Sequence, residues 1–142
     1  LGDHVWDQMN FNNEIDALER VCRPANLPDS NPGRDRLIVS INEFRIGIFT
    51  VLGRTFMGPK VNCPFRTASQ LVEEMKDETD AIIVEIHAET TSEKEAMGWY
   101  LDGKVSVVFF HKHTLTNSRA HTNQFKFSHF IVEQKLTRFA IR

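Results

Sequence analysis

The sequence predicts an α/β sandwich, in which helices pack against a largely parallel sheet. Residues 81–87, AIIVEIH, form a continuous apolar run, which is typical of a strand covered on both faces. Helix-like and strand-like segments alternate around this run, with loops at the strand ends. Since ligands of such folds bind beyond the strand ends, we expect the functional residues in those loops.

Length and composition indicate an ordinary globular protein. The chain has 142 residues, 41% of them hydrophobic and 25% charged, which is enough apolar material for one core. Its net charge of −2 points to no particular partner. No apolar run approaches the roughly 20 residues of a membrane span, and we see no signal peptide, so we expect no membrane association. Two cysteines outside any C-x-x-C pattern favour a reduced, cytoplasmic protein.

The first half of the chain predicts a helix, a loop and two strands. A short helix begins near Asn13 and is followed by a long loop over residues 22–35, where three prolines exclude regular structure. Residues 37–41 and 44–51 are rich in β-branched and aromatic side chains and predict two strands joined by a tight turn.

The second half predicts two further helices and two core strands. A Gly/Pro-rich loop over residues 53–65 leads to a helix over residues 67–76, with Thr67 as its N-cap. After the strand at 81–87, residues 91–99 predict one or two helical turns. VSVVFF, over residues 105–110, is the last predicted core strand.

Histidines mark the ends of these last two strands. His111 and His113 follow the final core strand two residues apart, and both can reach one metal ion because the chain leaves the strand there. His87 ends the preceding strand. Two solvated loop histidines and a hydrogen-bonded polar residue are the alternatives. The coincidence of histidines at neighbouring strand ends favours a metal site.

Acidic and basic residues extend this candidate set. Asp3 and His4 are adjacent and could supply a hard metal ligand and a proton donor, although a capping Asp beside a surface His is the simpler interpretation. Glu85, within the apolar run, predicts an outward-facing residue or a partner of a histidine ligand. Arg54 predicts either a phosphate contact or a salt bridge.

Mixed carboxylate and imidazole ligands favour Fe or Mn, with Zn as a further candidate, over Ca or Mg. Such centres activate water for attack on phosphate, and two ions can clamp the attacking and leaving oxygens. The sequence contains no P-loop, no dinucleotide glycine motif and no stacking platform for nucleic acid. The residues therefore indicate no nucleic-acid partner, and homo-oligomerisation is left open.

Several blocks resemble the YmdB-like metallophosphoesterases of bacteria, a family of the calcineurin-like superfamily. They are, in order, GDHVWDQ, VCRPANLP, PGRD, GRTFMGP, NCPF and VEIHAETTSEKEAMGWYLDGKVS. The resemblance covers residues 2 to about 109. It implies a dinuclear metal centre that hydrolyses phosphodiesters, including 2′,3′-cyclic nucleotides.

The resemblance also implies roles for individual residues. The family has Gly-Asn-His where this chain has Gly-Asp-His, so Asp3 takes the place of an Asn ligand and His4 that of the general acid. The histidine of the HAE block is a ligand, which corresponds to His87. Two further ligands correspond to His111 and His113, although the first is displaced by one residue from the family spacing.

Composition changes near residue 109. Residues 1–109 carry 11 Lys/Arg against 18 Asp/Glu, whereas residues 110–142 carry 6 against 1 and contain no Gly or Pro. We therefore divide the chain into a partial metallophosphoesterase domain, 1–109, and a divergent tail, 110–142. A truncated start and a frameshifted tail would explain both ends, and sequencing the locus tests this.

Three functional hypotheses follow. The family's upstream Asp and bridging carboxylate have no counterpart here, so we expect impaired phosphodiesterase activity. The alternative is a non-catalytic remnant or interaction module. A nucleic-acid-binding tail, based only on a charge of +5 over residues 110–142, is the weakest of the three.

Overall fold

The computed structural model describes residues 19–111 and 127–130. The helix predicted from Asn13 lies mostly outside this part of the chain. Within it, one mixed sheet of five strands is covered by two helices, which confirms the predicted α/β class. The strands are β1 (Leu37–Ile41), β2 (Phe44–Leu52), β3 (Ala81–His87), β4 (Val107–His111) and β5 (Phe127–Phe130).

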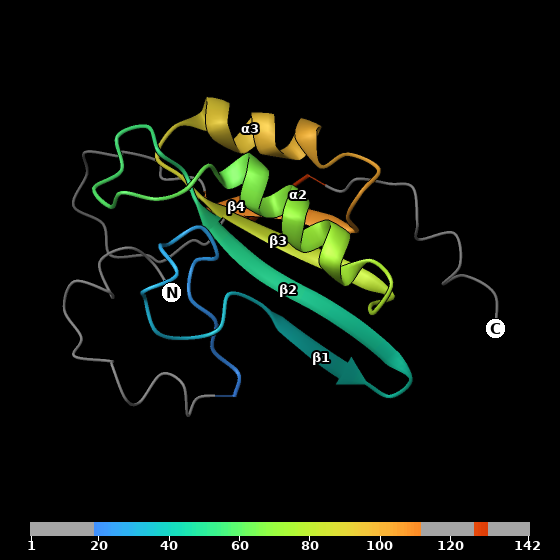
Figure 1. Cartoon of the computed structure of the whole chain (residues 1–142). Coiled ribbons are helices and arrows are strands. Elements are labelled where there is room, and N and C mark those ends of the chain that lie inside the picture. Colours follow the sequence, from blue (N-terminus) through green and yellow to red (C-terminus); the bar gives the residue numbers. More distant parts are fainter. Residues whose placement is uncertain (1–18, 112–126, 131–142) are drawn as a thin grey trace, which may run out of the picture.

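The strands lie in the sheet in sequence order (Figure 1). β2, β3 and β4 are parallel, while the edge strands β1 and β5 are antiparallel to their neighbours. A tight turn at Asn42, with φ of 55°, joins β1 to β2, and asparagine tolerates this left-handed conformation.

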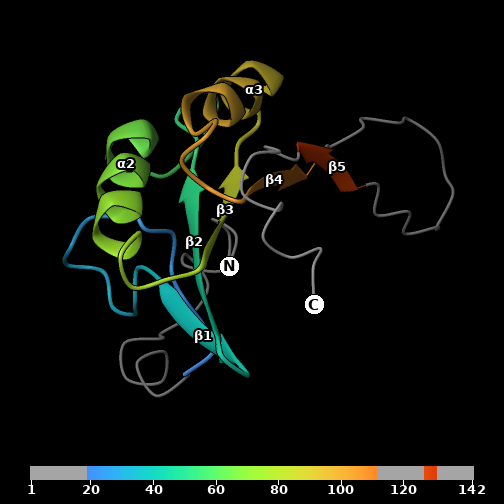
Figure 2. The ribbon, with the colours of Figure 1, turned by 90° about the vertical axis from the view of Figure 1, so that its right-hand side faces the viewer.

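Both helices pack on one face of the sheet (Figures 1 and 2). α2 (Pro64–Met75) connects β2 to β3, and α3 (Thr91–Tyr100) connects β3 to β4. Because parallel crossovers are right-handed, two successive crossovers in the same direction put their helices on the same side. The core between helices and sheet contains Phe49, Val51, Ala68, Leu71, Met75, Val84, Ile86, Met97, Leu101 and Val108.

Some details differ from the sequence prediction, and β4 begins at Val107 rather than at residue 105. α2 begins at Pro64 rather than at Thr67, and its N-cap is Cys63. Proline suits the first helical position because its fixed φ matches the helix and its missing N–H would have no helical partner there. β3 alternates between buried and half-buried residues, so within the described chain its helix-facing side is the better covered.

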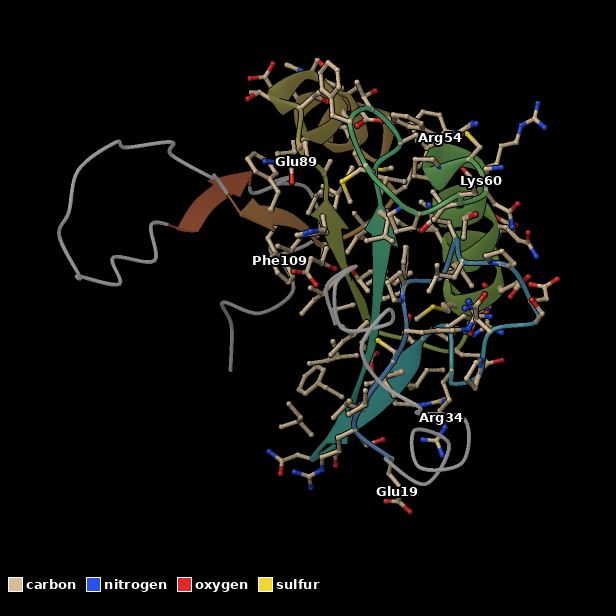
Figure 3. The ribbon with its side chains drawn as sticks, turned by 90° about the vertical axis from the view of Figure 1, so that its left-hand side faces the viewer. Glu19, Arg34, Arg54, Lys60, Glu89 and Phe109 are labelled. Atoms are coloured by element: carbon tan, nitrogen blue, oxygen red, sulfur yellow. The ribbon has the colours of Figure 1, made fainter. Side chains whose placement is uncertain are left out.

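The loops after the parallel strands meet at one end of the sheet. Residues 53–63 follow β2 and residues 88–90 follow β3, and Figure 3 shows Arg54, Lys60 and Glu89 at this end. This is the edge at which the sequence predicts the functional residues.

Candidate functional site

The last residues of the three parallel strands lie level with one another. Leu52 of β2 pairs with His87 of β3. Glu85 pairs with Phe109 of β4, and His87 and His111 each lie two residues further along their own strands. The backbone therefore brings two of the predicted metal ligands together at the carboxyl ends of neighbouring strands, where ligands of α/β folds bind.

Asp3, His4 and His113 lie outside the described residues. Within residues 19–111 and 127–130, no group of three or more His, Cys, Asp or Glu side chains could hold a metal ion. His87 is half-buried at the end of β3, and His111 ends β4. Two histidine positions suit a transition metal, and further ligands would complete its coordination.

A buried asparagine fixes the end of β2. Asn26 is fully buried, and its side chain accepts a hydrogen bond from the Leu52 N–H at 2.8 Å and donates to the Leu52 carbonyl at 2.8 Å. It also donates to the Asn62 carbonyl at 3.1 Å, while the Asn62 N–H donates to the Asn26 carbonyl at 2.8 Å. The Asn26 side chain thus forms with the Leu52 backbone the hydrogen bonds that a neighbouring strand would otherwise form. Through Leu52 and Asn62, it holds both ends of the loop over residues 53–62.

Glu93 joins the loops that follow β2 and β3. Its carboxylate accepts hydrogen bonds from the Arg54 N–H at 2.9 Å and from the Thr55 N–H at 3.2 Å. It also accepts from the Thr90 hydroxyl at 3.1 Å, and Thr90 caps α3 by accepting from the Glu93 N–H. Thr90 and Glu93 occupy the positions of a capping box, but the carboxylate binds the Thr90 hydroxyl in place of its N–H and also binds a second loop.

Gly53 allows the two loops to approach closely. Its N–H donates to the His87 carbonyl at 2.8 Å. A Cβ atom at this position would lie 2.6 Å from the Ala88 Cβ and 2.6 Å from a Glu93 carboxylate oxygen. A residue with a side chain would therefore push apart the loops that start beside the predicted metal ligand.

Opposite charges line this end of the sheet. Arg54 is exposed and forms no side-chain ion pair within residues 19–110, so both predicted alternatives, a phosphate contact and a salt bridge, stay open. Lys94, next to Glu93 on α3, is only 4% exposed. Burial lowers the pKa of the Lys94 ammonium group, and the Glu89 carboxylate opposes this shift.

Glu85 lies on the sheet face opposite the helices and is half-buried. Burial raises the pKa of the nearby Cys22 thiol, and the Glu85 carboxylate adds to this increase. The thiolate form of Cys22 is therefore disfavoured, and Cys22 and Cys63 are both free thiols. Glu85 thus lies on the face predicted as outward but is half-buried, and its role as a partner of a histidine ligand stays a prediction.

Asn26, Glu93 and Lys94 were not predicted as site residues. Glu93 carried a recognisable signal, because Thr90-x-x-Glu93 has the spacing of a capping box. The position of Asn26 between Pro24 and Pro28 indicated a loop but no partner. The buried state of Lys94 had no signal in the sequence, since lysine on a short helix is usually solvated.

No helix within the described residues is long and apolar enough to cross a membrane. The fold and the strand-end histidines define an α/β domain with a candidate metal-binding edge. A family model for YmdB-like proteins matches residues 1–124. The chain therefore belongs to the YmdB-like family, and the match includes every predicted site residue.

Relatives and solved structures agree with this assignment. The chain is 39% identical over 117 residues to a 2′,3′-cyclic-nucleotide 2′-phosphodiesterase of Bacillus subtilis, which covers 82% of this chain and 44% of that protein. A crystal structure of a hypothetical protein from Thermus thermophilus is similar with a TM-score of 0.67 and 38% identity, over 85% of this chain and 48% of that one.

A further crystal structure, of a novel phosphatase from Mycoplasma pneumoniae, has a TM-score of 0.68 and 33% identity. It covers 83% of this chain and 43% of that chain. The chain thus spans less than half the length of each of these proteins, and the activity of the whole protein is a matter for proposal.

Proposed function

We propose that this chain forms part of a metal-dependent phosphodiesterase centre at the carboxyl end of its parallel sheet. The observation that carries the proposal is the position of His87 and His111 at the carboxyl ends of the neighbouring parallel strands β3 and β4. It is supported by membership of the YmdB-like family and by the phosphodiesterase and phosphatase names of its relatives.

In this proposal, four residues bind two divalent ions, either Fe or Mn, with Zn as a further candidate. Asp3 supplies an oxygen, and His87, His111 and His113 supply ring nitrogens. When bound, the ions would activate a water molecule and neutralise charge on the phosphate. The His4 imidazolium donates its proton to the leaving oxygen, which is the step that general acid catalysis accelerates.

Loops around the site have a supporting role. The hydrogen bonds of Asn26 hold the end of β2, and the Glu93 carboxylate holds the loop that follows it. The Gly53 N–H at the start of this loop donates to the His87 carbonyl, so the His87 backbone is fixed as well. Fixed positions matter because a ligand displaced by about 1 Å weakens both metal binding and alignment of the substrate.

The proposed substrate is a small phosphodiester, such as a 2′,3′-cyclic nucleotide. This substrate class is taken from the name of the Bacillus subtilis relative. The free thiols of Cys22 and Cys63 fit a reducing compartment, and a cytoplasmic location is part of the proposal.

Hydrolysis of bis-p-nitrophenyl phosphate by the purified chain tests this function. We expect slow turnover that requires added Mn²⁺ or Fe²⁺, is abolished by a chelator and is lost in His4→Ala. His121→Ala is the matched control, because His121 is a histidine outside the predicted site. Turnover that persists in His4→Ala would remove the proposed acid. No turnover with any metal would instead favour a non-catalytic interaction module.

A further inference from the structure

The loop after β2 presents an aromatic ring to solvent in an unfavourable backbone conformation. Phe56 has a φ of 61° and is 86% exposed. A bulky residue in the left-handed region is rare, because its Cβ crowds the following carbonyl. The described chain has one other non-glycine residue with positive φ, Asn42, and its place in a hairpin turn explains it.

Neither packing nor backbone preference accounts for phenylalanine at this position. The exposed ring gains little from burial, and asparagine or glycine would suit the backbone better. Strained residues that persist in this way tend to occur at binding sites, held there by the surrounding structure.

The surrounding structure does hold this turn. The two residues before Phe56 are fixed through their N–H groups, with Arg54 and Thr55 both donating to the Glu93 carboxylate. Gly53, at the base of the loop, donates to the carbonyl of His87. Phe56 therefore belongs to an anchored segment, and this segment is hydrogen-bonded to the backbone of His87, a predicted metal ligand.

Basic residues on the same loop as this ring suit a phosphorylated ligand. Arg54, two residues away, is exposed and has no ion-pair partner within residues 19–110. Lys60 is exposed on the same loop (Figure 3). An exposed aromatic ring next to basic side chains is the combination that binds a flat base attached to a phosphate.

We propose that Phe56 is a specificity-determining residue, whose ring stacks on the aromatic base of a nucleoside phosphodiester. The inference rests on the proposed phosphodiesterase function and adds the base as the part of the substrate that this loop recognises. Stacking on an aromatic side chain is tolerant of base identity, so purine and pyrimidine substrates should both depend on Phe56.

The test compares two substrates that differ in the base. Adenosine 2′,3′-cyclic phosphate carries one, and glycerol 1,2-cyclic phosphate does not. Phe56→Asn removes the ring while keeping a residue that accepts positive φ, so it separates the ring from the backbone. We expect it to raise the ratio of the two KM values, adenosine over glycerol, about tenfold. Phe56→Trp should keep the wild-type ratio.

Trp99→Ala is the control, because Trp99 is an aromatic residue that is 69% exposed near the far end of α3. It should leave the KM ratio unchanged. An unchanged ratio in Phe56→Asn, with both substrates hydrolysed, would overturn the inference and leave the proposed function intact.

Failure of the proposed function has a different signature, because the wild-type chain would then hydrolyse neither cyclic phosphate. Titration calorimetry with adenosine 3′-monophosphate and glycerol phosphate decides the role of Phe56 in that case. Roughly tenfold weaker binding of adenosine 3′-monophosphate by Phe56→Asn supports stacking. Equal affinity in the wild type and the variant would refute it.

Discussion

Replacing Asn26 by alanine should destabilise the chain more than any surface substitution. The side chain of Asn26 forms three buried or partly buried hydrogen bonds, two with the backbone of Leu52 and one with the carbonyl of Asn62. Each such bond contributes about 1 kcal/mol net, so we expect a loss of about 3 kcal/mol in the free energy of unfolding. For a chain of this size, that corresponds to a decrease of roughly 10 °C in Tm.

Urea denaturation followed by far-UV circular dichroism measures this loss. Asn62→Ala is the matched control, because Asn62 bonds to Asn26 through its backbone N–H and carbonyl and its side chain is exposed. It should change the free energy of unfolding by less than about 0.5 kcal/mol. Equal midpoints for Asn26→Ala and Asn62→Ala would refute the reasoning.

Asn26→Asp tests the direction of the same bonds. A carboxylate can still accept from the Leu52 N–H, but it cannot donate to the carbonyls of Leu52 and Asn62. It should therefore be at least as destabilising as alanine at neutral pH, and less so at acid pH, where the protonated carboxyl regains one donor.

Two further predictions concern the same end of the sheet. Gly53→Ala should cost about 1–3 kcal/mol of stability, because its Cβ would clash with Ala88 and Glu93, whereas Gly58→Ala meets open space and should be nearly neutral in the same urea assay. Burial lowers the pKa of Lys94 in the folded chain below the ordinary 10.5. At pH values between the folded pKa and 10.5, the unfolded chain therefore binds more protons than the folded chain. The free energy of unfolding should rise with pH in that window, and urea titrations at several pH values should show Lys94→Met without this rise. A slope that survives in Lys94→Met would contradict the assignment.

Local patterns were sufficient to predict the strands. β1 matches its predicted bounds of 37–41, and β3 matches 81–87, because β-branched runs bounded by turn residues define a strand locally. The predicted end of this strand at His87 is confirmed, whereas the prediction that functional residues gather at the strand ends stays a prediction. Helix starts were less predictable, since Pro64 and Thr67 are both acceptable near an N-terminus and packing selects between them.

The hydrogen bonds that organise the site could not be predicted. Asn26 binds a strand end 26 residues away, and Glu93 binds a loop 39 residues before it. Such partners depend on the tertiary arrangement, and neither residue type indicates which backbone groups will lie opposite. The division of the chain near residue 109 and the roles of Asp3, His4 and His113 stay predictions.

The most direct test of the proposed centre is the metal content of the purified chain after gel filtration, measured by mass spectrometry. We expect Mn or Fe to co-elute with the wild-type chain and with His121→Ala, and to be lost from His87→Ala, because removal of a ligand weakens metal binding at least tenfold. Equal metal content in the wild type and His87→Ala would contradict the central claim that the end of β3 binds metal.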